Sequence, residues 1–145
     1  RLKYLLSYRR VRQPLNDGTS HSIHMEVLMT NAMPRMAPEQ FRACIDACYA
    51  CAEACNACAA ACLQESDPKP LARCIALNID CAEICQLAAG YMARGSELAA
   101  MICRACAEVC EACGAECEKH AKMEHCRQCA EACRRCAEEC RRMAA

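Results

Sequence analysis

Three stretches of the chain repeat one spacing of cysteine, with steps of three and four residues between neighbours. Such steps keep side chains on one face of an α-helix, because the helix has about 3.6 residues per turn. Charged and polar residues fill the positions between them, so each stretch predicts an amphipathic helix whose inner stripe is made of thiols. The cysteines of the three stripes are Cys44, Cys48, Cys51, Cys55, Cys58 and Cys62; Cys103, Cys106, Cys110, Cys113 and Cys117; and Cys126, Cys129, Cys133, Cys136 and Cys140.

A fourth stretch carries the same period with fewer cysteines. Its inner positions are Leu71, Cys74, Asn78, Cys81, Cys85, Ala88 and Met92. Proline and glycine mark the breaks between the stretches, with Pro38 suited to the start of the first helix and Ser96 to the N-cap of the third. These signals predict long helices at about residues 38–64, 70–92, 96–120 and 123–143.

Short connections make successive helices antiparallel, so the predicted fold is all-α, an antiparallel up-down-up-down four-helix bundle with a Cys-lined core. We expect one Cys-rich domain over residues 23–145, opening with a short helix at residues 23–33. Residues 1–22 show no sustained period, and we interpret them as an arm that is either flexible or foreign to the native chain.

The composition is unusual for the core of a bundle. The 145 residues include 19 cysteines, one phenylalanine and no tryptophan. Cysteine is a weaker helix former than alanine by up to roughly 0.7 kcal/mol. A thiol in place of a branched aliphatic side chain also forgoes about 0.8 kcal/mol for each missing methylene. Packing alone therefore does not explain the thiols, and the fold requires a further source of stability.

The charge balance excludes some classes of partner. Basic and acidic side chains number 18 each, for a formal net charge of zero, which argues against nucleic acid or an anionic membrane as the main partner. Pairs four residues apart, such as Arg134 and Glu138, predict a solvated helical face. No apolar run is long enough to span a membrane. Arg9 and Arg10 lack a following apolar segment, so we expect a cytoplasmic protein that is not exported.

A structural disulfide framework is one explanation for many cysteines. It fits this chain poorly, because the count is odd and the thiols follow long helices rather than loops. Cysteines four apart on a regular helix are also awkwardly placed for the narrow geometry of the bond. A disulfide-stapled structural bundle remains an alternative.

Zinc and iron-sulfur sites both use pairs of cysteines separated by two residues. Such sites close with four ligands around one centre, whereas this sequence singles out no privileged set of four. A zinc protein or an iron-sulfur redox protein is therefore a second alternative.

Cu(I) suits a continuous row of thiols better. It is a soft monovalent ion that selects thiolates and accepts low coordination numbers. Two thiolates on one helix or on facing helices can hold one ion, and each thiolate can bridge two ions. Binding would displace thiol protons and add to the free energy of folding. The pattern indicates storage of multiple Cu(I) ions rather than catalysis, so we expect no enzyme activity.

Residues 24–143 resemble the bacterial copper storage proteins. The resemblance is carried by the cysteine row from Cys44 to Cys62, the segment Cys74-Ile75-Ala76-Leu77-Asn78-Ile79-Asp80-Cys81-Ala82-Glu83-Ile84-Cys85, and the region from His120 to Cys140. Without an export signal the chain is more similar to the cytosolic branch. The resemblance implies cytosolic Cu(I) storage, a homotetramer, and a copper donor or acceptor that is a chaperone or a small thiol.

Non-cysteine ligands gather near the third break. His120 lies three residues after Cys117 and Met123 three before Cys126, so both fall on the inward stripe, with His125 adjacent. We interpret this group as a mouth that admits Cu(I), the alternative being an exposed pair of histidines. Asn78 is either an oxygen ligand or a structural hydrogen-bonding residue, since a buried amide requires partners.

Overall fold

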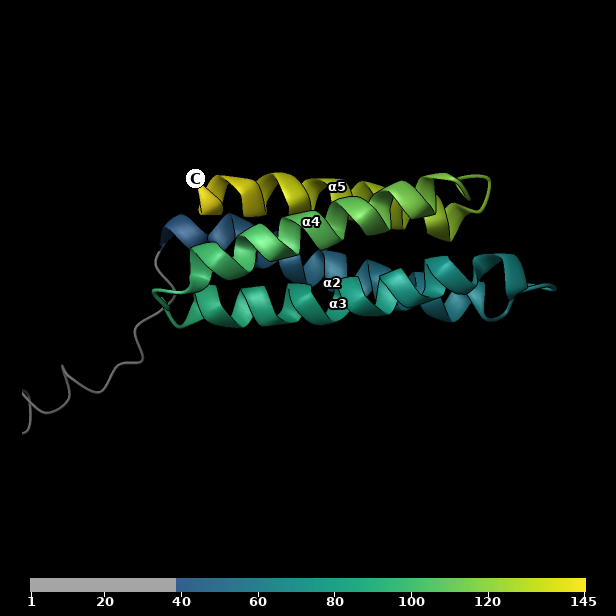
Figure 1. Ribbon diagram of the computed structural model, residues 1–145, viewed down its shortest axis with the longest axis horizontal. Helices are drawn as coiled ribbons and strands as arrows, with labels where there is room; N and C mark the ends of the chain where they lie inside the picture. The colour runs from purple at the N-terminus through teal and green to yellow at the C-terminus, as the bar shows by residue number, and fades with distance from the viewer. Residues whose placement is uncertain (1–38) are drawn as a thin grey trace, which may run out of the picture. The chain divides into compact units, whose positions relative to one another are not determined.

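The computed structural model describes residues 39–145, which form four long α-helices (Figure 1). Helix α2 spans Arg42–Cys62, α3 spans Ala72–Ala93, α4 spans Ala99–Glu118 and α5 spans Glu124–Ala144. This part of the chain contains no strand, and the predicted all-α class is confirmed. The arm predicted at residues 1–22, the short helix predicted at 23–33 and the helix start predicted at Pro38 lie outside the described residues.

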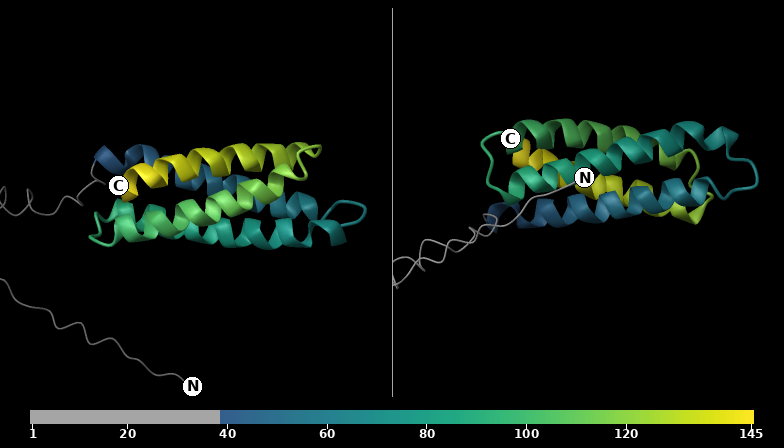
Figure 2. Two further views of the ribbon diagram at one scale, coloured as in Figure 1. Left: turned by 45° about the horizontal axis from the view of Figure 1, so that its top comes forward. Right: turned by 90° about the horizontal axis from the view of Figure 1, so that it is seen from below.

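The four helices form one up-down-up-down bundle. Each helix packs against its neighbour in the chain, and α5 closes the ring by packing against α2. The connections α2–α3 and α4–α5 lie at one end, which we call the mouth end, and the connection α3–α4 lies at the far end (Figure 2). The antiparallel bundle predicted from the short breaks is therefore confirmed.

Helices α2 and α3 begin later than the sequence pattern predicts, because a 3₁₀ turn precedes each. The turn η1 spans Glu39–Phe41 before α2, and η2 spans Lys69–Leu71 before α3. Pro70 lies in the first positions of η2, where its missing N–H removes no hydrogen bond of the helix. Tight turns of this kind are common at helix termini.

The connection between α3 and α4 closes with a Schellman motif. Gly95 has φ 63°, and its N–H bonds the carbonyl of Met92 at 3.0 Å while the Ser96 N–H bonds that of Tyr91 at 3.0 Å. Ser96 does not occupy the N-cap predicted for it, because α4 begins three residues later, at Ala99. Its hydroxyl instead accepts the Leu98 N–H at 3.2 Å, within the turn that leads into the helix.

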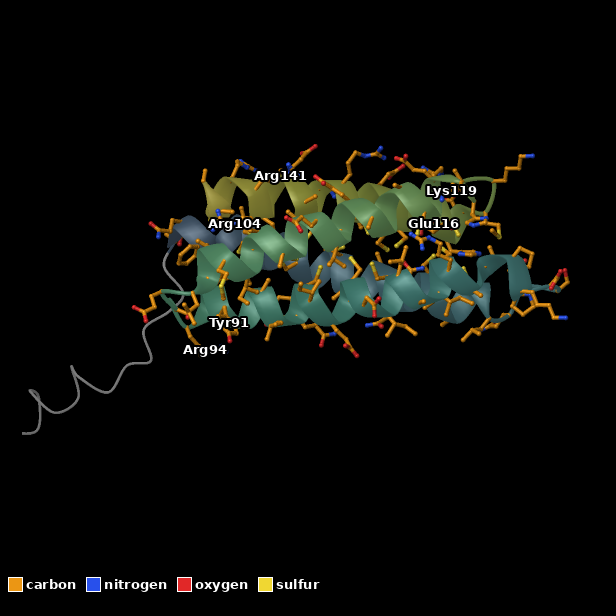
Figure 3. All side chains as sticks on the ribbon, viewed as in Figure 1. Tyr91, Arg94, Arg104, Glu116, Lys119 and Arg141 are labelled. Atoms are coloured by element: carbon orange, nitrogen blue, oxygen red, sulfur yellow. The ribbon has the colours of Figure 1, made fainter. Side chains whose placement is uncertain are left out.

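The core is made almost wholly of cysteine and alanine. Among the described residues, the other buried hydrophobic side chains are Ile45, Leu71 and Met92. Helices α4 and α5 approach closely at Gly114, where a Cβ would lie 3.2 Å from the Cβ of Cys133. Apart from the buried Glu116, the charged side chains of the described residues lie on the outside of the bundle (Figure 3). Among the described helices, none combines the length and apolar character that crossing a bilayer requires.

Candidate metal centre

All nineteen cysteines are free thiols with 0% of their surface exposed. The predicted inward stripes therefore exist as one column of sulfur along the axis of the bundle. Helix α2 contributes six cysteines, α3 three, α4 five and α5 five. The predicted helix stripes thus bring together thiols that are far apart in the sequence.

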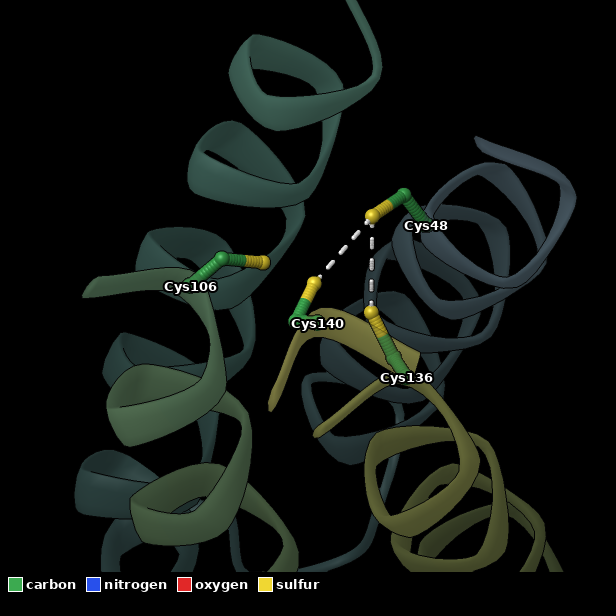
Figure 4. A group of neighbouring side chains, drawn as sticks. All are labelled: Cys48, Cys106, Cys136 and Cys140. Atoms are coloured by element: carbon green, nitrogen blue, oxygen red, sulfur yellow. Dashed lines mark hydrogen bonds between the residues drawn. The ribbon is translucent and has the colours of Figure 1, made fainter. Parts of the chain in front are cut away.

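One group of four thiols illustrates the packing of the column. Cys48 comes from α2, Cys106 from α4, and Cys136 and Cys140 from α5 (Figure 4). Their sulfurs all lie within 4.8 Å of one another, with Cys136 3.6 Å and Cys140 3.7 Å from Cys48. Two metal–sulfur bonds of about 2.3 Å each span up to about 4.6 Å, so one ion can bind between such sulfurs with little movement.

Neighbouring groups share members. Cys51, Cys81, Cys85 and Cys110 form one group, Cys51, Cys55, Cys81 and Cys133 a second, and Cys55, Cys113, Cys129 and Cys133 a third. A thiolate that belongs to two groups can bridge two ions. The geometry therefore singles out no closed set of four ligands, which a zinc or iron-sulfur site would require.

The contacts are also unlike those of disulfides. Facing sulfurs such as Cys44 and Cys140 lie 3.6 Å apart, and sulfurs four residues apart such as Cys51 and Cys55 lie 3.9 Å apart. A disulfide requires about 2.05 Å. The thiols instead contact one another as weak S–H donors and acceptors.

At the mouth end, His125 faces three thiols. Its Nδ1 lies 3.4 Å from the sulfur of Cys126, 3.5 Å from that of Cys58 and 3.8 Å from that of Cys62. On the other side of the ring, Nε2 lies 3.2 Å from Oε1 of Glu65. Cys58, Cys62 and Cys126 also form a group of four with Cys74. The imidazole thus joins the outermost thiols to the surface.

The thiols at this end differ in how firmly they hold a proton. Burial is the main cause that raises the pKa of Cys126 to about 12, and the negative charges of Cys62 and Cys74 contribute next. Burial likewise raises the pKa of Cys62. Thiol donors at Cys117 and Cys58 instead lower the pKa of Cys74 to about 3. A neutral solution therefore presents an incoming cation with both thiolate and thiol ligands at the mouth.

His120 occupies a different position from the one its spacing predicts. Its Nε2 lies 3.8 Å from Oε1 of Glu116, and no hydrogen bond joins it to a thiol among the described residues. Glu116 is 7% exposed and also binds Lys119 at 2.7 Å and Arg73 at 3.0 Å. The pKa of this carboxyl is lowered, mainly by the hydrogen bond from Lys119. Burial acts in the opposite direction, and the hydrogen bond from Arg73 lowers the pKa further. Figure 3 shows Glu116 and Lys119 together near the end of α4.

Met123 precedes α5 as its N-cap residue and is partly buried against the core. The backbone is extended there, with φ −87° and ψ 127°. Met123 is thus close to Cys126 in the sequence and packs against the core, whereas His125 contacts the mouth thiols directly. The sequence did not single out Glu65 or Glu116. Glu65 lies in a loop, and Glu116 is one of several glutamates on α4.

Asn78 is fully buried and has partners for both ends of its amide. Its Oδ1 accepts S–H bonds from Cys129 at 3.0 Å, Cys113 at 3.2 Å and Cys117 at 3.6 Å. Its Nδ2 donates to Cys74 at 3.5 Å. The structural hydrogen-bonding role is thus present, and the carbonyl oxygen also lies among sulfurs that could share an ion with it.

The far end of the column holds no thiol beyond Cys44, Cys103 and Cys140. Met92 is 0% and Ala99 3% exposed there, and the partly buried Met143 packs against the same core. Apolar side chains therefore close this end, as expected for gap-filling methionine.

A four-helix bundle filled with free thiols is a binding protein for soft metal ions. The sequence profile of the copper storage proteins matches residues 37–145, and the chain belongs to this family. It is similar to the Cu(I)-bound copper storage protein BsCsp3, with 50% identity and a TM-score of 0.71 over 74% of this chain and 100% of that one.

Two further relatives agree. A cytosolic copper storage protein from Streptomyces lividans, in a structure with five coppers, is 44% identical with a TM-score of 0.71 over 73% of this chain and 92% of that one. The cysteine-rich protein YhjQ of Bacillus subtilis is 51% identical over 83 residues, which cover 57% of this chain and 77% of YhjQ.

Proposed function

We propose that this protein stores multiple Cu(I) ions in the cytoplasm, with the nineteen buried thiols as ligands and without catalysing a reaction. The observation that carries the proposal is that every cysteine is free and fully buried. At least sixteen of the nineteen belong to groups of four whose sulfurs lie within 4.8 Å of one another, and several of these groups share members. Cu(I) is the ion that fits shared, low-coordinate thiolate sites. The cytosolic relative from Streptomyces lividans supports the proposed compartment.

Each ion would be held by two or three sulfurs, and each sulfur would contact up to two ions. If this bridging extends along the column, the capacity is on the order of one Cu(I) per cysteine. Each thiol that becomes a ligand releases one proton to solvent, whether its sulfur binds one ion or two, and the copper stays Cu(I) throughout. Bound ions would also supply the stability that the cysteine and alanine core lacks.

The mouth end is where ions would enter. His125 is the ligand of this end best placed to pass an ion inward, because its Nδ1 faces three thiols. Met123 offers a thioether beside it. His120 is placed against Glu116 and would act at most as a surface ligand.

Supply and withdrawal of copper require a partner with its own soft ligand, either a copper chaperone or a small thiol. We further propose a homo-oligomer. Large hydrophobic side chains on α3 and at the start of α4 are about half exposed: Ile79 46%, Leu87 48%, Leu98 47% and Met101 53%. A second copy of the chain could cover them, and light scattering measures the resulting mass.

Anaerobic Cu(I) titration of the reduced protein against a competing chelator tests the storage function. We expect uptake far above one or two ions, and a large loss when Cys51, Cys55, Cys106 and Cys110 are changed together to serine. A matched control changes the exposed alanines Ala57, Ala60, Ala105 and Ala112 of the same helices to serine. Saturation at one or two ions, or undiminished uptake by the cysteine variant, would refute storage in the column.

A further inference from the structure

Glu65 is a loop residue with an acidic side chain directed at the mouth histidine. It lies in the connection between α2 and α3, three residues after the end of α2, and its side chain is 41% exposed. Its Oε1 lies 3.2 Å from Nε2 of His125, a residue 60 positions away in the chain. The pair therefore ties the α2–α3 connection to the first turn of α5.

This contact determines which nitrogen of His125 carries the proton. A carboxylate only accepts hydrogen bonds, so the 3.2 Å contact requires a proton on Nε2. In the neutral ring Nδ1 is then left with its lone pair free. That lone pair is directed at Cys126, Cys58 and Cys62, at 3.4 to 3.8 Å.

We propose that Glu65 is a positioning residue for Cu(I) transfer. By accepting the Nε2–H of His125, it holds the ring in the tautomer and orientation in which Nδ1 can take Cu(I) and pass it to the mouth thiols. Protein metal sites commonly orient a ligating histidine through its second nitrogen in this way. The inference rests on the proposed function, since it concerns the path by which stored ions enter.

The step is a ligand exchange without electron transfer. The donor's bond to Cu(I) breaks and a bond from Nδ1 forms, and Cu–S bonds to Cys58, Cys62 or Cys126 then replace the nitrogen. A proton from each protonated thiol that becomes a ligand goes to solvent, while the Nε2 proton stays in its hydrogen bond with Glu65.

The other mouth carboxylate has a different role. Both Arg73 and Lys119 bind Oε2 of Glu116, and its Oε1 is 3.8 Å from His120, which forms no hydrogen bond to sulfur within residues 39–145. Among the described residues Glu65 has no ion-pair partner other than His125. The positioning role is therefore specific to the pair of Glu65 and His125.

The first test is spectroscopic and uses the reduced, metal-free full chain. Ring ¹⁵N shifts of His125, assigned with a His125→Asn variant, are expected to show the Nε2–H tautomer in the wild type. In Glu65→Ala we expect a substantial population with the proton on Nδ1. Because Glu65 is exposed in a loop, the variant should fold, and circular dichroism checks this. Retention of the wild-type tautomer in Glu65→Ala would overturn the proposal.

The second test is the initial rate of Cu(I) transfer from a coloured Cu(I)–chelator complex under anaerobic conditions. We expect Glu65→Ala to load about tenfold more slowly, with an unchanged final capacity. Glu65→Gln should recover at least half of this loss, because its amide oxygen still accepts the Nε2–H. The control Glu53→Ala removes an exposed glutamate of α2 and should load at the wild-type rate.

The outcomes separate this inference from the storage function. If the wild type binds many ions and Glu65→Ala loads at the same rate, or Glu65→Gln is as slow as Glu65→Ala, the positioning role is wrong while storage stands. If the wild type binds only one or two ions, the storage function itself fails.

Discussion

The amide oxygen of Asn78 on α3 accepts a hydrogen bond from the thiol of Cys129 on α5, 3.0 Å away across the centre of the bundle. Between Cys74 and Cys81, Asn78 occupies an inward position of α3 at which the other helices carry a cysteine. Its amide makes four contacts with sulfur. It therefore orders several thiols in the metal-free protein.

We predict that Asn78→Ala destabilises the metal-free protein by about 2 kcal/mol, because it leaves a cavity and removes the acceptor of three S–H groups. Urea unfolding of the reduced protein measures the change. Asn56→Ala, at an exposed position on α2, is the control and should change stability by less than about 0.5 kcal/mol. Equal free energies of unfolding for the two variants would show that the hydrogen bonds of Asn78 to the thiols do not stabilise the metal-free protein.

The glycines of α3 and α4 should respond in opposite directions to alanine. Gly90→Ala is expected to stabilise the protein by up to about 1 kcal/mol, because alanine is the better helix former and only the flexible end of Arg94 is near. Gly114→Ala is expected to destabilise the protein, because the new Cβ would lie too close to the Cβ of Cys133. The Cβ of Cys133 is fixed to the backbone of α5, so relieving the contact requires α5 to shift. Urea unfolding of both variants checks this, and a stabilised Gly114→Ala would contradict the close approach.

His125 and His120 should differ in their effect on loading. His125→Ala removes the imidazole that contacts three mouth thiols, so we expect the initial rate of Cu(I) transfer to fall about tenfold. His120→Ala removes a residue whose only described partner is Glu116 and should slow transfer by less than about twofold. Stopped-flow mixing with a Cu(I)–chelator complex compares them, and the reverse ranking would place the mouth ligand at His120.

Loading should release protons. The pKa of Cys126 is raised to about 12 by burial and then by neighbouring charge, so at pH 7 this group is a thiol whose proton copper must displace. The pKa of Cys74 is lowered to about 3 by thiol donors, so it is already a thiolate. A raised pKa means stronger competition from protons at lower pH, and Cu(I) binding should weaken as the pH falls.

An indicator dye in weakly buffered, oxygen-free solution measures this release. We expect Cys126→Ser to release about one proton fewer than the wild type at saturation, and Cys74→Ser to release the same number while binding less copper. Equal losses in the two variants would contradict this difference between the two thiols.

The sequence was sufficient to predict the bundle and its sulfur column, because a period of three and four residues holds wherever the chain is helical. Prediction failed where the helix stops. The stripe that places His120 inward is interrupted after Glu118, where a run of turns precedes α5. His125, only adjacent to the stripe in sequence, is therefore the residue that contacts the thiols.

The contact between Glu65 and His125 had no signal in the sequence, since it joins a connection to the first turn of α5, and their relative placement depends on the packing of all four helices. The shift of the N-cap of α4 from Ser96 to Leu98 has a similar cause. The turn is fixed by Gly95 and the end of α3 rather than by the preference of one serine.

Ions that enter at the proposed mouth would also leave there, because the buried apolar side chains Met92 and Ala99 fill the far end of the core. Ions that have travelled deepest can then leave only after those nearer the surface have gone. Such a store works as a stack, in which the last ion deposited is the first withdrawn. A recipient would meet only the topmost ions, and supply to it would stay steady until the column is nearly empty.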